Sequence, residues 1–129
     1  MKSVILIGAG GHAKALVETL RELDRPVSAY VDPKQSTWLK SRQISDDSSV
    51  NPDYETIVLG IGAVEPAGLR HRLKILDRYL ERGFDAEPVA HHAAHVSPDA
   101  TLEQGVAVLG GAIIQPGAIV GRGSIVNSG

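Results

Sequence analysis

Cysteine is absent from the chain and aromatic residues are scarce, and both facts restrict its chemistry. None of the 129 residues is cysteine, which excludes disulfides, thiolate nucleophiles and zinc sites with cysteine ligands. Aromatic residues make up only 4% of the chain, so aliphatic side chains must build most of the core. Hydrophobic residues account for 43% and charged residues for 22%, a composition that supports a globular fold.

The chain also lacks an excess of basic charge and any long apolar segment. Its formal net charge is −2, so the chain has no excess of positive charge to contact the phosphates of a nucleic acid. We therefore expect no nucleic-acid partner. The apolar run after Ser3 ends at Gly8 and is too short for a signal peptide. No stretch is long enough to cross a bilayer. These features predict a cytoplasmic protein without a membrane partner.

Residues 1–88 show the alternation of strands and helices that is typical of a parallel α/β sheet. Apolar runs predict strands at 4–7, 27–31 and 57–61, with a short strand near 43–46. Helical spacing of apolar residues predicts a first helix over about 13–23.

A second helix is predicted to begin at Pro66 and to end just before Gly83. Its apolar face would be formed by Leu69, Leu73, Leu76 and Leu80. Arg70 lies on this helix and is a candidate phosphate ligand. It is equally well explained as one more charge on a basic helix that also carries Arg72, Lys74 and Arg78.

A glycine-rich turn follows the first predicted strand. Gly8, Gly10 and Ala13 fit the G-x-G-x-x-A pattern of dinucleotide-binding folds, and Asp32 ends the second strand, where it can accept hydrogen bonds from a ribose or a base. Such a turn brings backbone N–H groups and a helix N-terminus close to a pyrophosphate. Two alternatives remain open: a tight turn without a ligand, and a small NAD-binding protein, although the strands are few for a full dinucleotide fold.

Residues 89–129 follow a different period. Large aliphatic residues, which we call anchors, recur every six positions. A small or branched residue stands two positions before each anchor after the first. A period of six fits the triangular coils of a hexapeptide β-helix and neither a helix nor a plain strand. The chain is expected to end within the second coil without a cap, as a fragment of a longer protein would. The six anchors are Val96, Leu102, Val108, Ile114, Val120 and Val126.

Five segments of the chain carry a further signal: Ile5–Lys14, Gly60-Ile61-Gly62, Leu69-Arg70, His91–Ser97 and Ile125–Gly129. Together they resemble the sialic acid, bacillosamine and perosamine type of sugar-nucleotide O- or N-acetyltransferases. Ile5–Lys14 is similar to that family's N-terminal signature, and Gly60-Ile61-Gly62 is similar to its second glycine turn. Leu69-Arg70 matches a Leu/Ile-Arg pair in the following helix. His91–Ser97 resembles the lead-in to the β-helix, with His92 in place of a proline. Ile125–Gly129 resembles the stretch before the catalytic segment.

The resemblance implies a short Rossmann-like lobe over 1–88 and the first coils of a left-handed parallel β-helix over 89–129. It implies an enzyme that moves an acetyl group from acetyl-CoA to an amino or hydroxyl group of a nucleotide-linked sugar, with UDP- or GDP-amino sugars as partners and a homotrimer as the assembly. Asn127 would line the acceptor site. The implied sugar-nucleotide-binding residues are Gly8, Gly10, Gly11, His12, Asp32, Gly60, Gly62 and Arg70.

In this family a histidine serves as general base, a role that suits a group with a pKa near the working pH. That histidine follows the Asn-Ser/Thr-Gly stretch, so we expect it beyond Gly129 and expect no catalytic residue within the chain. Ala63-Val64-Glu65 departs from the acidic–amide pair that the family usually has after its second glycine turn. A non-catalytic nucleotide-binding or assembly module is a further alternative.

The five histidines offer no clear substitute for that base. His71 is expected on the polar side of a helix. His91, His92 and His95 form a His-His-x-x-His pattern, but a metal site would also need a carboxylate or a fourth ligand at fixed geometry. We therefore expect no metal.

Overall fold

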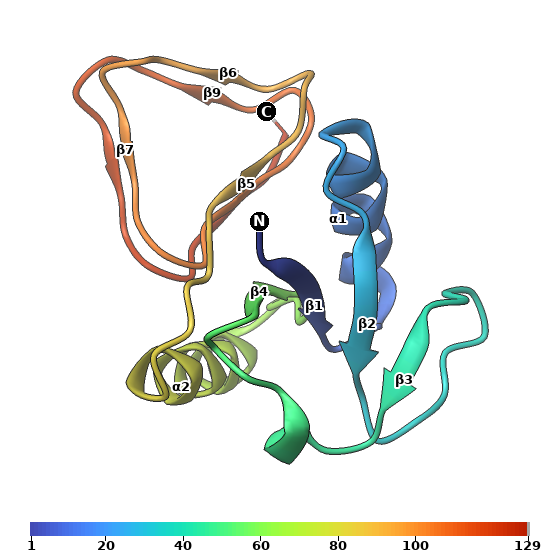
Figure 1. Cartoon of the computed structure of the whole chain (residues 1–129). Helices are drawn as coiled ribbons and strands as arrows, with labels where there is room; N and C mark the ends of the chain where they lie inside the picture. Colours follow the sequence, from blue (N-terminus) through green and yellow to red (C-terminus); the bar gives the residue numbers. More distant parts are fainter. Residues whose placement is uncertain (129) are drawn as a thin grey trace.

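A four-stranded parallel sheet organises the N-terminal lobe. The computed structural model, which describes residues 1–128, places the strands in the order β3-β2-β1-β4 (Figure 1). This parallel pairing confirms the predicted α/β class. The elements are β1 Ser3–Ile7, α1 Gly11–Glu22, β2 Val27–Val31, β3 Arg42–Ile44, the short 3-10 helix η1 Asp47–Ser49, β4 Glu55–Leu59 and α2 Pro66–Glu81.

The two faces of this sheet are buried against different partners, because side chains alternate along a strand. On one face, Leu6 of β1 packs in a cluster with Leu16 of α1 and with Ala107, which lies in the C-terminal part of the chain. On the other face, Ile5 packs in a cluster with Leu76 of α2. Two separate apolar layers therefore hold the helices on opposite sides of the sheet.

Two details of the predicted lobe need correction. The fourth strand, β4, covers Glu55–Leu59 rather than 57–61, because the apolar run continues beyond the strand to Ile61, which packs against the core. The apolar face of α2 was also misplaced. Leu76 is fully buried, but Leu69 is 42% exposed, and the buried side chains next to Leu76 are those of Arg72 and Tyr79.

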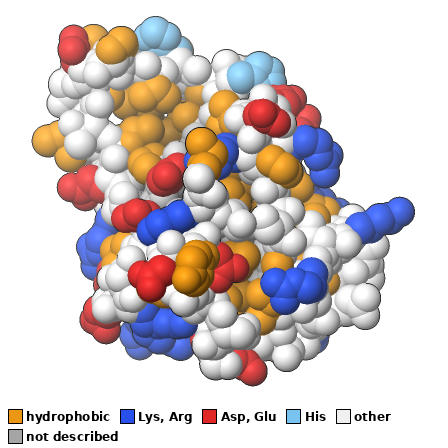
Figure 2. Space-filling model, in the orientation of Figure 1, with side chains coloured by type: hydrophobic (Ala, Val, Ile, Leu, Met, Phe, Trp, Pro, Cys, Tyr) orange, Lys and Arg blue, Asp and Glu red, His pale blue; other side chains and the backbone are white. Residues whose placement is uncertain are grey.

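The C-terminal part of the chain winds into a triangular β-helix of two-residue strands (Figure 1). Its three faces are the parallel sheets β11-β8-β5, β6-β9 and β10-β7. All six predicted anchors belong to one inward-facing apolar cluster, which confirms the period of six. Figure 2 shows hydrophobic side chains gathered over this part of the molecule. The strands are β5 Val89–Ala90, β6 His95–Val96, β7 Thr101–Leu102, β8 Ala107–Val108, β9 Ile113–Ile114, β10 Ile119–Val120 and β11 Ile125–Val126.

The β-helix begins one strand earlier than its first predicted anchor. Val89 pairs with Ala107, and Ala107 pairs in turn with Ile125, so β5, β8 and β11 stack on one face. Thus β5–β7 and β8–β10 each complete a turn, and β11 opens the next one. The expectation that the chain ends within the second coil is therefore wrong, and the cause is Ala90, which is too small to be recognised as an anchor.

Helix α2 packs against one corner of the β-helix. Gly105 and Gly123 form this corner in successive turns, with φ of +76° and +72°. A Cβ on Gly105 would lie 2.8 Å from Leu76 Cδ2, and one on Gly123 would lie 2.6 Å from Leu73 Cδ2. Glycine is therefore needed here both for its left-handed backbone and for the close approach of the helix.

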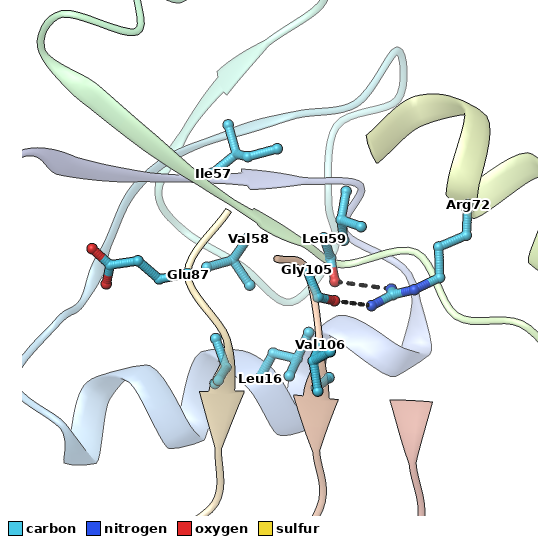
Figure 3. Close-up of a pocket in the computed structure, with 10 residues that line it drawn as sticks. Leu16, Ile57, Val58, Leu59, Arg72, Glu87, Gly105 and Val106 are labelled. Carbon is cyan, nitrogen blue, oxygen red and sulfur yellow. Dashed lines mark hydrogen bonds between the residues drawn. The ribbon is translucent and has the colours of Figure 1, made fainter. Parts of the chain in front are cut away.

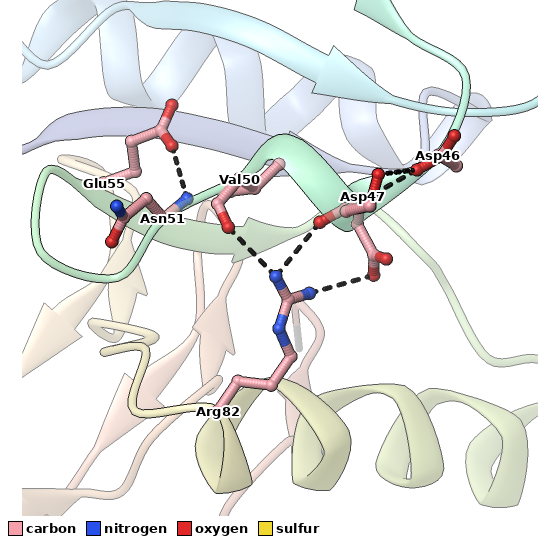
Figure 4. A network of polar contacts seen from close by, with 7 residues as sticks. Asp46, Asp47, Val50, Asn51, Glu55 and Arg82 are labelled. Carbon is pink, nitrogen blue, oxygen red and sulfur yellow. Dashed lines mark hydrogen bonds and ion pairs between the residues drawn. The ribbon is translucent and has the colours of Figure 1, made fainter.

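The segment between β3 and β4 is fixed to the end of α2 by Arg82 (Figure 4). Its Nη2 donates to the carbonyl oxygens of Asp47 at 3.0 Å and Val50 at 2.9 Å, and its Nη1 lies 3.4 Å from the Asp47 carboxylate. The neighbouring turn is closed by Glu55, whose carboxylate accepts from Asn51 N–H at 2.8 Å. None of the helices within residues 1–128 is long and apolar enough to cross a membrane.

Candidate functional site

The two glycine turns of the lobe meet at the carboxyl ends of β1 and β4. Gly60 N–H donates to Ile7 O at 2.7 Å, and a Cβ on Gly60 would lie 2.1 Å from Gly8 O. Gly8 has φ +85°, and a Cβ there would lie 2.9 Å from Ile61 Cγ1. Packing alone therefore requires glycine at both positions. Their contact with a ligand remains a prediction.

The N-terminus of α1 is open. Gly10 is the residue that precedes α1, and no side chain in the described chain caps the helix there. No described atom outside the immediate neighbours lies within 4 Å of a Cβ built on Gly10 or Gly11. The first turn carries no acidic residue. Backbone N–H groups at this helix end are thus available to an anion, which the helix dipole favours.

His12 lies in the first turn of α1, against the second glycine turn. A Cβ on Gly62 would come within 3.0 Å of His12 Cβ, so glycine leaves room for the imidazole. His12 Nε2 is buried and has no hydrogen-bond partner among the described residues. Burial lowers the pKa of His12 below its usual value of 6.5, and the positive charge of Arg72 lowers it further. The side chain is therefore neutral at neutral pH.

Asp32 holds the first glycine turn in place. Its Oδ2 accepts from Ala9 N–H at 3.1 Å, and its Oδ1 accepts from Lys34 N–H at 2.9 Å. Trp38, which carried no recognisable signal in the sequence, donates from Nε1 to Ala9 O at 3.0 Å. Both polar groups of Ala9 are therefore anchored. Since a carboxylate offers about four acceptor positions, Asp32 can still accept a bond from a ligand.

A cleft of about 400 Å³ opens beside the ends of β1 and β2. We call it the strand-end cleft. Its lining includes Gly8, Asp32, Ile61, His71 and Arg78. Its volume is in the range of small-molecule sites, and its lining combines apolar surface with groups of both charges. His71, expected only to face solvent, is exposed but also lines this cleft.

A second cleft of about 490 Å³ lies where the lobe meets the β-helix. We call it the junction cleft. The lobe contributes Ala63, Glu65 and Leu69, and the β-helix contributes Ser124 and Asn127. The segment that departs from the family pattern thus shares a cleft with Asn127, the predicted acceptor-site residue. Gly129 of the predicted pre-catalytic stretch lies outside the described residues.

Arg70 lines neither cleft. Its side chain is exposed, and no hydrogen bond or ion pair from it is formed within residues 1–128. The structure therefore brings together the two glycine turns and His12, and places Asp32 on the strand-end cleft beside Gly8. It leaves Arg70 apart from them. The binding roles of all these residues remain predictions.

Arg72 is the largest fully buried side chain within residues 1–128, and no sequence pattern singled it out. Its Nε donates to Gly123 O at 2.7 Å and its Nη2 to Gly105 O at 2.8 Å. Its Nη1 donates to Ile61 O and, at 3.5 Å, to Leu59 O. Figure 3 shows the bonds to Leu59 and Gly105. Burial lowers the pKa of Arg72 to about 10, so the guanidinium stays charged at neutral pH.

The space beside Arg72 is a small packing gap between the lobe and the β-helix and not a ligand site. Residues of β4, α1 and the β-helix enclose it, among them Ile57, Leu16 and Val106 (Figure 3). Its volume of about 10 Å³ holds at most one water molecule. Arg72 therefore acts as a buried polar link between the lobe and the β-helix.

No protein-family model and no curated protein sequence matches the chain. Solved structures do match it over 98% of its length. The acetyltransferase domain of PglB from Neisseria gonorrhoeae FA1090, in complex with acetyl coenzyme A, is 27% identical with a TM-score of 0.85, and 62% of it is covered.

Two structures from Caulobacter crescentus, both in complex with CoA and GDP-perosamine, are also similar. A mutant GDP-perosamine N-acetyltransferase is 30% identical with a TM-score of 0.81, and 60% of it is covered. PerB is 29% identical with a TM-score of 0.73, and 63% of it is covered. The chain thus spans about three fifths of the length of these structures. Its fold is that of the corresponding part of sugar acetyltransferases, which supports the family resemblance carried by its sequence motifs.

Proposed function

We propose that this chain binds a nucleotide-linked sugar and forms part of an acetyltransferase that uses acetyl-CoA. One observation carries the proposal. The glycine turns of β1 and β4 meet at the open N-terminus of α1, in a fold shared with acetyltransferases that were solved with CoA and GDP-perosamine. An open helix N-terminus next to backbone without side chains suits a diphosphate.

In this proposal, three parts of the ligand bind at three places: the N-terminus of α1, the strand-end cleft and the junction cleft. The phosphates would lie at Gly10, Gly11 and the N–H groups of α1, and the nucleoside in the strand-end cleft, with Asp32 on its hydroxyl groups. The sugar would reach the junction cleft. There Glu65 supplies a negative charge for an amino group and Asn127 a neutral hydrogen-bonding amide.

The reaction would join the sugar nitrogen or oxygen to the acetyl carbon and break the thioester bond. The acceptor loses a proton to a base, and the coenzyme leaves as a thiolate that takes up a proton. By family resemblance the base is a histidine that follows Gly129, so no described residue is assigned that role. His12, neutral and close to the second glycine turn, would position the sugar nucleotide.

The remaining proposals concern architecture and assembly. We propose a Rossmann-like lobe over 1–88, a left-handed β-helix from residue 89 and a cytoplasmic homotrimer. Ile113 and Ile119, which are 64% and 73% exposed on two outer faces of the β-helix, favour burial against further copies.

Two other functions make different predictions. A small NAD-binding protein would bind NAD at the same glycine turn, with Asp32 on a ribose. A non-catalytic assembly module would bind neither NAD nor a sugar nucleotide. Calorimetry of the chain with a UDP-amino sugar, a GDP-amino sugar and NAD separates the three.

A matched pair of variants sharpens this experiment. Gly10→Val adds bulk at an extended position that has free space, so it should spare the fold and abolish binding of the sugar nucleotide. Gly121→Val in the β-helix, where a Cβ meets only Glu103 Oε1 at 3.7 Å, is the control and should bind as the unchanged chain does. Binding of NAD without binding of either sugar nucleotide would overturn the proposal.

A further inference from the structure

Three metal-ligating side chains from distant parts of the sequence meet where α1 packs against β5. They are Glu22, the last residue of α1, and His91 and His92, which directly follow β5. One ligand atom from each lies within 4.8 Å of the other two. Figure 1 shows α1 alongside β5, and Figure 2 shows histidine side chains at the surface of this end of the molecule. The carboxylate that the histidine pattern lacked in the sequence is thus supplied by the fold.

We propose that Glu22, His91 and His92 bind a divalent transition-metal ion, with zinc as the best fit. Two imidazole nitrogens and one carboxylate oxygen form a ligand set that zinc accepts, with water in the fourth position. Zinc–ligand bonds of about 2.0–2.2 Å place two donor atoms at most roughly 4.4 Å apart. Small side-chain movements therefore close the site. Magnesium prefers oxygen ligands alone and fits this set poorly.

The backbone around the ligands is already fixed. His91 N–H donates to Val108 O at 2.9 Å, and His91 O accepts from Ala94 N–H at 2.9 Å. The imidazole of His91 is confined by Gly110, where a Cβ would lie 3.2 Å from Nδ1. Glu22 is held by the helix that ends at it. Ligands on such rigid elements lose little freedom when an ion binds.

The side chains are in contact without an ion. His92 Nδ1 pairs with the Glu22 carboxylate, and the rings of His91 and His92 stack with centroids 4.3 Å apart and planes at 30°. His91 Nδ1 accepts from Ala93 N–H at 3.0 Å. Zinc binding replaces this bond, and the Ala93 amide, which is exposed, then turns to water. His92 and Glu22 are 61% and 40% exposed, so an ion reaches them from solvent.

The site would connect the two parts of the molecule. Glu22 belongs to the lobe, and both histidines belong to the β-helix, so a bound ion ties α1 to the first coil. This role is independent of the sugar-nucleotide site. It predicts that zinc raises the thermal stability of the whole chain, since a ligand that binds only the folded state stabilises it.

The test uses the metal-free chain. Titration calorimetry with zinc chloride measures binding, and thermal unfolding with and without zinc chloride measures the change in Tm. Magnesium chloride is tested in parallel. We expect one zinc ion per chain, a higher Tm with zinc and no change with magnesium. Glu22→Gln and His92→Gln should each weaken zinc binding at least about tenfold, because the loss of even an outer partner of a metal ligand costs roughly 10–100-fold.

His95→Gln is the matched control. His95 is exposed, lies on the neighbouring strand β6 and is not part of the three-residue group, so this variant should bind zinc like the unchanged chain. His91→Gln replaces either test variant if that variant does not fold. The proposal is overturned if zinc leaves the Tm and the heat of titration unchanged. It is also overturned if the test variants bind zinc as well as the His95→Gln control does.

Discussion

Arg72 Nε donates to the carbonyl oxygen of Gly123 at 2.7 Å, and this bond joins α2 of the lobe to a corner of the β-helix. The same guanidinium reaches Gly105 O at 2.8 Å. Gly105 and Gly123 occupy one corner in successive turns of the β-helix. A single buried side chain therefore fixes two turns against the end of β4, where the candidate site lies.

Replacement of Arg72 should destabilise the protein far more than replacement of Arg70. Arg72→Met leaves the carbonyl groups of Gly105 and Gly123 buried without donors, at an expected cost of about 2–4 kcal/mol in the free energy of unfolding. Arg70→Met, on the exposed side of the same helix, should change it by less than about 0.5 kcal/mol. Urea unfolding of both variants measures the difference. Equal stabilities would refute the role given to Arg72.

Gly60→Ala should disrupt the contact between the two glycine turns. Its new Cβ would lie 2.1 Å from Gly8 O, which is backbone and cannot move without separating β1 from β4. We expect a loss of about 2 kcal/mol or more.

Gly68→Ala is the control for this prediction. Gly68 lies within α2, and the nearest atom to its new Cβ is Ala63 Cα at 3.6 Å, so the better helix propensity of alanine should raise stability by up to about 1 kcal/mol. Thermal unfolding compares the two. A Gly60→Ala variant as stable as Gly68→Ala would contradict the close approach.

Removal of the Asp32 carboxylate should loosen the first glycine turn even without a ligand. Asp32→Ala leaves the amides of Ala9 and Lys34 without their acceptor, at an expected cost of about 1–3 kcal/mol. Asp53→Ala, at an exposed turn, should be close to neutral. Amide hydrogen exchange at Ala9 reports the change directly. Unaltered protection of Ala9 would mean that Asp32 serves a ligand alone.

His12 should make the fold sensitive to mild acid. Burial lowers its pKa below the value of 6.5 expected for the unfolded chain, so on acidification the unfolded state takes up the proton first. The contribution of neutral His12 to stability is complete above about pH 6.5, falls as the pH decreases through that value, and levels off below the folded pKa.

The measurement compares the unchanged chain with His12→Gln between about pH 7.5 and pH 5. The free energy of unfolding of the unchanged chain should fall relative to that of the variant as the pH is lowered. The other histidines are common to both proteins and cancel in the difference. A difference that stays constant with pH, or grows in the opposite direction, would contradict the lowered pKa.

The sequence predicted those features that repeat or follow one another closely along the chain. The period of six predicted the inward stack, because each anchor points into the same prism. The same period did not identify Ala90 as an earlier inward-facing position, because its side chain is too small to be recognised as an anchor. Pro66 correctly marked the start of α2, and Gly83, with φ +92°, lies just beyond its end as expected.

The sequence missed contacts between residues that are distant along the chain. The acceptors of Arg72 lie 33 and 51 positions away, so a charged residue on a helix was taken for a surface group. Glu22 could not be connected with His91 and His92 for the same reason. The sequence also did not predict that the two carboxylate oxygens of Asp32 accept from the backbone amides of Ala9 and Lys34, and its contact with a ligand stays a prediction. Local patterns give elements and motifs, and only the packed fold gives these partners.

The central claim, that a sugar nucleotide lies across the lobe and the junction with the β-helix, is tested most directly by amide NMR. The isotope-labelled chain is titrated with a GDP- or UDP-linked amino sugar, and shifted amide signals are assigned. The account predicts that signals from Gly8–Ala13, Gly60–Glu65 and Asn127 shift together in one saturable step. Shifts confined to other parts of the chain, or no shifts at all, would contradict it.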